Sequence, residues 1–81
     1  MSGHKINKLI KKFDSAYQEM DYHEMMAMKS EGIEKEEHED LAMMFNDEIF
    51  DIATDIKKLN PSNYMMKKHK DNLTDILEHA I

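Results

Sequence analysis

Several residue types that restrict a protein's possible folds and activities are rare or missing in this sequence. There is no cysteine, so no disulfide can form and no thiolate nucleophile is available. This composition is compatible with a reducing cytoplasm, where we expect the protein to reside. Only two glycines and one proline occur in 81 residues, too few turn-forming residues for a fold rich in strands. No apolar run approaches the roughly 20 residues of a membrane-spanning helix, so we expect no membrane contact.

Arginine is also absent, and the charge is unevenly distributed along the chain. Residues 1–13 hold four lysines and no acid, residues 14–55 hold fourteen acids against two lysines, and residues 56–81 hold five lysines against three acids. An acidic middle segment repels nucleic acid, and lysine alone lacks the planar fork that arginine offers to phosphate and guanine. We therefore expect no direct binding to nucleic acid.

The sequence contains enough apolar residues to form the core of one folded domain spanning residues 1–81. The chain is 41% hydrophobic and 35% charged, a composition that supports a core and argues against disorder. A chain of this size buries only about 60% of its unfolded surface. Small folds of this kind are often stabilised by oligomerisation.

Hydrophobic residues recur at spacings of three and four, the period of an α-helix. They predict an all-α fold, a small three-helix bundle with two long antiparallel helices at about 4–30 and 34–59 and a shorter helix at about 61–80. The stripe on the first helix consists of Ile6, Leu9, Ile10, Phe13, Ala16, Tyr17 and Met20. The second carries Leu41, Phe45, Ile49, Ile52, Ile56 and Leu59, and the third Met66, His69, Leu73, Ile76, Leu77 and Ala80.

The predicted helix boundaries rest on glycine, asparagine and proline. Gly32 is expected to end the first helix in a Schellman motif, with Ile33 folding back onto Met28. Asn60 is expected to cap the third helix, with Pro61 in its first turn. The short connections require neighbouring helices to be antiparallel or sharply crossed.

Some large apolar residues do not fit the stripes. Met43 and Phe50, seven residues apart, project away from the core face of the second helix, and Tyr22, Met25 and Met26 do so on the first. Flexible methionine beside aromatic rings is typical of adaptable binding surfaces, although a third helix could instead cover these residues. We predict that the five residues bind a protein partner or a second copy in a homodimer, giving a small regulatory protein.

Two alternative functions remain open. The acidic segment 14–55 could let the chain inhibit a host protein by blocking its nucleic-acid-binding surface, as small phage-encoded or mobile-element-encoded antagonists do. Alternatively, His23 and His38, each four residues after a glutamate, could join nearby glutamates or methionines in a metal-binding helical module. We expect His69 to be a hydrogen-bonded core histidine and not a ligand.

Catalysis finds no support in the sequence. It contains no phosphate-binding loop, no glycine-flanked serine and no serine matched with a histidine and an aspartate. We therefore predict that the protein is not an enzyme and has no catalytic residue, no cofactor and no resident metal.

Overall fold

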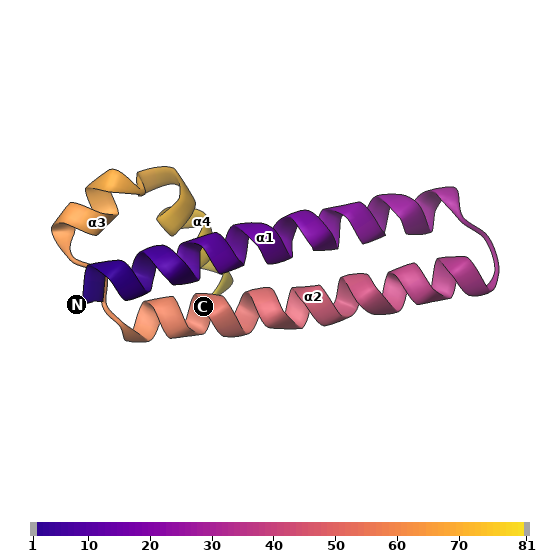
Figure 1. Ribbon diagram of the computed structural model, residues 1–81, viewed down its shortest axis with the longest axis horizontal. Coiled ribbons are helices and arrows are strands. Elements are labelled where there is room, and N and C mark those ends of the chain that lie inside the picture. The colour runs from indigo at the N-terminus through magenta and orange to yellow at the C-terminus, as the bar shows by residue number, and fades with distance from the viewer. Residues whose placement is uncertain (1, 81) are drawn as a thin grey trace.

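The computed structural model describes residues 2–80 and confirms the all-α fold class. The chain forms α1 (Ser2–Lys29), α2 (Ile33–Lys58), α3 (Asn63–Lys68) and α4 (Lys70–His79). Figure 1 shows α1 and α2 as an antiparallel hairpin that runs the whole length of the molecule, with both chain ends away from the turn. The molecule is elongated, measuring 47 × 20 × 18 Å.

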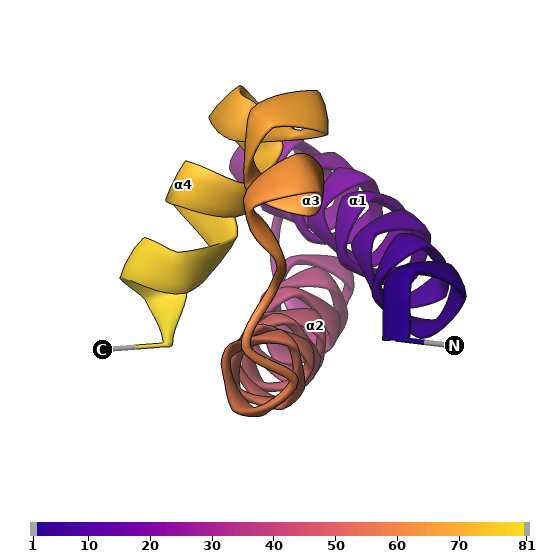
Figure 2. The same ribbon diagram turned by 90° about the vertical axis from the view of Figure 1, so that its left-hand side faces the viewer.

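Most of the core lies at the end of the hairpin away from the turn, where α4 also packs against α1 and α2. α3 and α4 lie beside this end only, with α4 crossing the hairpin on one side (Figures 1 and 2). Apolar side chains there are removed from water, which supplies most of the stability of such a fold. The buried cluster comprises Ile6, Ile10, Phe13, Ala16, Met20, Ala42, Ile49, Ile52, Ala53, Ile56, Met65, Leu73 and Ile76.

The predicted third helix is divided in two at His69. This residue has φ −118° and ψ 36°, outside the helical region, and it both ends α3 and begins α4. Its amide donates to the Met65 carbonyl at 2.9 Å, and its own carbonyl accepts from the Leu73 amide at 2.7 Å. The break therefore leaves the main-chain groups of His69 satisfied while changing the direction of the chain.

The expected Schellman motif at Gly32 is wrong. α1 ends at Lys29, and Gly32, with φ 65° and ψ −134°, stands immediately before α2, where its carbonyl accepts from the Glu36 amide at 3.2 Å. Ile33 and Met28 are 74% and 86% exposed, so Ile33 does not fold back to bury Met28. Two residues separate the end of α1 from Gly32, which is too long a connection for a Schellman motif. Gly32 is therefore the N-cap residue of α2 and not the C-terminal cap of α1.

The expected helix cap at Asn60 is also wrong. Asn60 has a positive φ of 51°, a left-handed conformation that asparagine tolerates better than most residues. It therefore ends α2, and its amide donates to the Lys57 carbonyl at 3.1 Å. Ser62 caps α3 instead, its Oγ accepting from the Met65 amide at 3.3 Å.

Beyond the reach of α4, the hairpin has only two helices. Two helices packed side by side cannot enclose a core, so apolar side chains on either side of their seam remain in contact with water. None of the helices in residues 2–80 combines the length with the apolar character needed to cross a bilayer. The exposed apolar residues near the turn are therefore surface features of a two-helix segment.

Candidate functional site

A groove runs between α1 and α2 in the part of the hairpin near the turn. We call it the methionine groove; it is lined by Glu24, Ala27, Met28, Lys35, Glu39, Ala42, Met43 and Asn46 and encloses about 650 Å³. The small side chains of Ala27 and Ala42 are buried between the helices. Met28 and Met43 remain exposed beside them. The groove thus combines a narrow apolar floor with flexible, polarizable walls.

The position of the groove follows from helical periodicity. Ala42, Ile49 and Ile56 are seven residues apart and so fall on one stripe of α2, where all three are buried. Along this stripe Ala42 lies toward the turn, and the two isoleucines lie toward the end of the hairpin where α4 packs. Met43 lies one position round the helix from Ala42 and therefore at the edge of this stripe.

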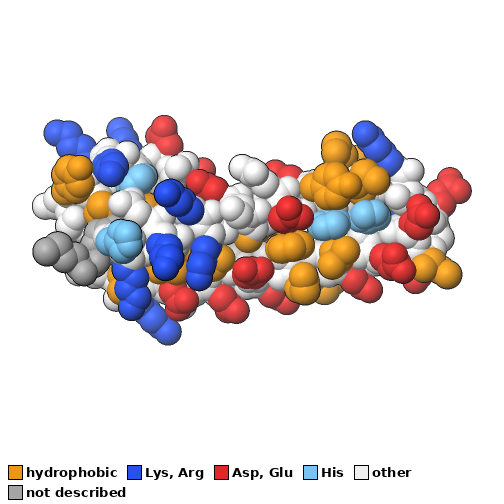
Figure 3. All heavy atoms as spheres, viewed as in Figure 1, with side chains coloured by type: hydrophobic (Ala, Val, Ile, Leu, Met, Phe, Trp, Pro, Cys, Tyr) orange, Lys and Arg blue, Asp and Glu red, His pale blue; other side chains and the backbone are white. Residues whose placement is uncertain are grey.

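The opposite side of the same hairpin segment carries a pair of histidines. His23 on α1 and His38 on α2 face each other with their Nδ1 atoms 2.9 Å apart. The His23 ring stacks on Phe45 with centroids 5.8 Å apart and an interplanar angle of 7°. Tyr22 presents its ring edgewise to both imidazoles. Figure 3 shows two histidine side chains next to each other on the part of the hairpin near the turn, with hydrophobic side chains on both flanks.

The hydrogen bond between these histidines requires one donor and one acceptor. The other ring nitrogen of His23, Nε2, lies 3.8 Å from Glu19 Oε2. The pair therefore links α1 to α2 near the turn.

The histidine pair does not amount to a closed metal site. Within residues 2–80, no set of three or more histidine or acidic side chains converges as a metal ion requires. The ring centroids lie 5.2 Å apart while the nitrogens are 2.9 Å apart, so both nitrogens lie between the rings and point at each other. This head-on arrangement is that of a hydrogen bond.

The structure places the five predicted partner-binding residues on two sides of the hairpin. Tyr22 accompanies the histidine pair, whereas Met43 lines the methionine groove. Met43 precedes Phe45 by two residues, which places the two about 200° apart around α2. Phe45 contacts His23, so Met43 faces away from the histidines.

The other three predicted residues differ in their exposure. Phe50 follows Met43 by seven residues and is half-exposed on the same side of α2. Met25 is exposed and Met26 is partly buried on α1. Ala27, Met28 and Ala42 also line the groove, although periodicity did not predict it. The signal present in the sequence is alanine at two core positions in the segment near the turn.

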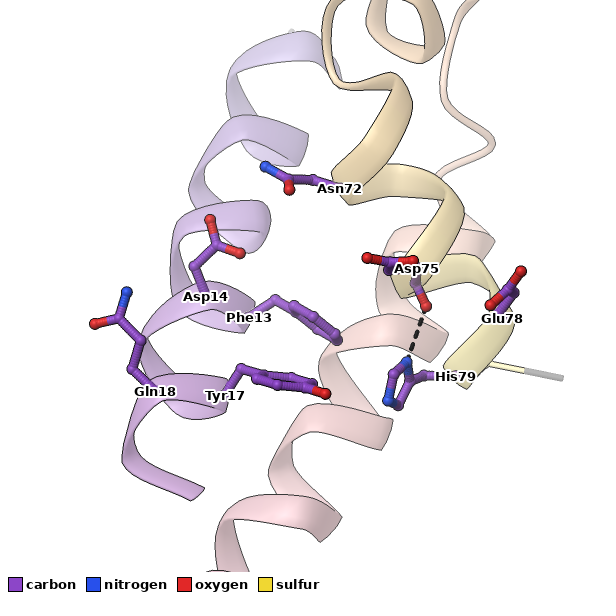
Figure 4. A pocket seen from close by; sticks show the side chains of 8 residues that line it. All are labelled: Phe13, Asp14, Tyr17, Gln18, Asn72, Asp75, Glu78 and His79. Atoms are coloured by element: carbon purple, nitrogen blue, oxygen red, sulfur yellow. Dashed lines mark hydrogen bonds between the residues drawn. The ribbon is translucent and has the colours of Figure 1, made fainter. Parts of the chain in front are cut away.

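A separate hollow lies between α1 and α4 (Figure 4). His79 sets its ring edge against Phe13 and Tyr17, with centroids 5.6 Å and 6.0 Å apart. Its Nδ1 donates to the Asp75 carbonyl at 2.9 Å, which fixes the ring orientation. Three carboxylates and two amides complete the lining, from Asp14, Asp75, Glu78, Gln18 and Asn72. These contacts hold the end of α4 against α1.

Comparison with known proteins adds no further information about the site. No family model matches the chain, and neither a curated protein nor a solved structure matches it.

Proposed function

We propose that this protein is a non-catalytic binding protein that takes an amphipathic helix of a partner into the methionine groove. The observation that carries the proposal is that α4 covers only part of the hairpin and leaves an apolar groove beyond it. A helix laid in a groove between two others is a common mode of peptide recognition. Within this chain, α4 already packs on both helices of the same hairpin.

The residues that line the groove favour a helix as occupant. Ala27 and Ala42 allow close approach of a partner's side chains, while Met28 and Met43 can change rotamer to fit around them. Removing the exposed surface of a methionine from water contributes up to about 1.5–3 kcal/mol when burial is complete. The two methionines together could therefore contribute a large share of the binding free energy.

Charge favours a basic partner. Glu24 and Glu39 stand at the groove against one lysine, Lys35. The surrounding segment, residues 14–55, holds fourteen acids and two lysines. A helix with a basic polar face would meet complementary charge and associate faster at low salt. Since the cysteine-free chain needs no oxidising environment, we place this activity in the cytoplasm.

The test uses two adjacent methionines as a matched pair. Met43 and Met44 are 65% and 52% exposed, but only Met43 lines the groove. Met43→Gln and Met44→Gln each remove one apolar side chain and leave the charge unchanged. A synthetic lysine-rich amphipathic helix is titrated into each protein by calorimetry, together with a glutamate-rich peptide that has the same apolar stripe.

We expect the basic peptide to bind the wild type and to lose about tenfold in affinity with Met43→Gln, but less than about threefold with Met44→Gln. Equal losses in both variants, or equal binding of the acidic peptide, would refute the proposal. Sedimentation of the wild type alone identifies the other occupant: a dimer that Met43→Gln dissociates means that a second copy fills the groove.

A further inference from the structure

The fold gathers most of the lysines at the end of the molecule opposite the turn. Figure 3 shows most of the visible basic side chains at the end where α3 lies, while acidic side chains predominate along the remaining length of the hairpin. This end contains the first turns of α1, the last turn of α2, and α3 with the start of α4. The lysines on these segments are Lys5, Lys8, Lys11, Lys12, Lys57, Lys58, Lys67, Lys68 and Lys70.

Part of this basic end is concave. A hollow of about 610 Å³ lies between α1 and the junction of α3 with α4, lined by His4, Asn7, Lys8, Lys11, Lys68 and His69. Three lysines and two histidines thus face one hollow, and among residues 4–80 no carboxylate belongs to its lining. His69 Nε2 donates to Asn7 Oδ1 at 2.9 Å, a contact that ties the two walls together.

Like charges gathered in a concavity repel one another and lower the stability of the fold. A bound anion removes that cost, and the concave shape strengthens the attraction by focusing the field. Lysine binds phosphate as a compact point charge with three donors. The hollow therefore has the charge, the donors and the shape of an anion-binding site.

We propose that this hollow binds a compact ligand carrying two or more phosphate groups, held by Lys8, Lys11 and Lys68. A small ligand fits better than a nucleic acid strand, because the acidic length of the hairpin repels an extended polyanion. The lack of arginine also favours phosphate oxygens over base edges as the recognised groups. The site is independent of the methionine groove, so either proposal can fail without the other.

The test compares two double variants with the same change in net charge. Lys8→Gln with Lys68→Gln removes one lysine from each wall of the hollow. Lys57→Gln with Lys58→Gln removes two lysines from the same end but outside its lining. Pyrophosphate, inorganic phosphate and a single-stranded oligonucleotide are each titrated into the full chain, with amide NMR shifts as the readout. Circular dichroism checks that every variant remains helical.

We expect pyrophosphate to bind the wild type more tightly than phosphate, with shifts centred on residues 4–11 and 68–69. Affinity should fall about tenfold or more in Lys8→Gln/Lys68→Gln and less than about threefold in the control. No saturable binding, or equal losses in both variants, overturns the proposal. Tighter binding of the oligonucleotide, with a salt dependence spanning many phosphates, would overturn the compact-ligand class. If a double variant unfolds, Lys11→Gln alone is tested against Lys5→Gln.

Discussion

Asn7 and His69, 62 residues apart in the sequence, are joined by a hydrogen bond of 2.9 Å from His69 Nε2 to Asn7 Oδ1. The bond fastens the break between α3 and α4 to the first turns of α1. It is a long-range polar contact at the point where the chain changes direction. Its contribution to stability can be measured.

Asn7→Ala should lower the free energy of unfolding by about 0.5–1.5 kcal/mol, because it removes the acceptor and leaves a half-buried donor unpaired. The control is Thr54→Ala, which removes a hydrogen bond made within one helix, to the Phe50 carbonyl. Thr54→Ala should change stability by less than about 0.5 kcal/mol. Urea unfolding followed by circular dichroism gives both values, and equal effects would mean that the Asn7 contact does not anchor the break.

Two phenylalanines test the division between core and surface. Phe13 is 4% exposed and Phe50 is 48% exposed. Phe13→Ala should cost about 3–5 kcal/mol, a large part of the roughly 4–12 kcal/mol expected for a chain of this length. Phe50→Ala should cost about 1 kcal/mol or less, since much of its ring is already in water. Thermal and urea unfolding measure both values. If Phe50→Ala unfolds the protein, Phe50 belongs to the core.

The backbone at Gly32 allows a test by chirality. With φ 65° and ψ −134°, Gly32 has a conformation that L residues avoid, while a methyl group built there meets no atom within 4 Å. Gly32→Ala should therefore destabilise the fold by about 1–3 kcal/mol through backbone strain alone. D-alanine, for which these angles mirror an extended, favourable L conformation, should be neutral or stabilising in a chemically synthesised chain. Destabilisation by both residues would contradict a conformational origin.

Removing one ring of the histidine pair should weaken the link between α1 and α2 near the turn. The Nδ1 atoms of His23 and His38 share a hydrogen bond of 2.9 Å, and His38→Ala removes one of the two partners. The free energy of unfolding should fall by about 0.5–1.5 kcal/mol. Urea unfolding at one fixed pH gives the value, and an unchanged stability would show that the pair does not stabilise the hairpin.

Much of this fold is readable in the sequence because helical periodicity is a local property. The stripes containing Ile6, Ile49 and Ile56 identify the buried faces, and the predicted ranges 4–30 and 34–59 agree with α1 and α2 to within about two residues. The same periodicity singled out Met43 as an apolar residue off the core face. A window of one or two turns suffices for each of these inferences.

The roles of the turn residues and the composition of the sites could not be predicted from local sequence patterns. Gly32 and Asn60 both tolerate a positive φ, so each could end one helix or precede the next. Which of the two occurs depends on how many residues are needed to connect the packed helices. Periodicity also could not show that Tyr22 and Met43 lie on opposite sides of the hairpin. That depends on how α1 is rotated against α2, which is fixed by packing along their whole length.

The sequence by itself determined the helices, their apolar stripes and the separation of charge into three segments, because each depends on neighbours in the chain. Only the tertiary structure decided that α4 stops short of the turn, leaving the methionine groove open. It also brought Lys8 and Lys68 to one hollow and His23 to His38. His23 and His38 are 15 positions apart in the sequence, and Lys8 and Lys68 are 60 positions apart. Their placement is set by the packing of whole helices.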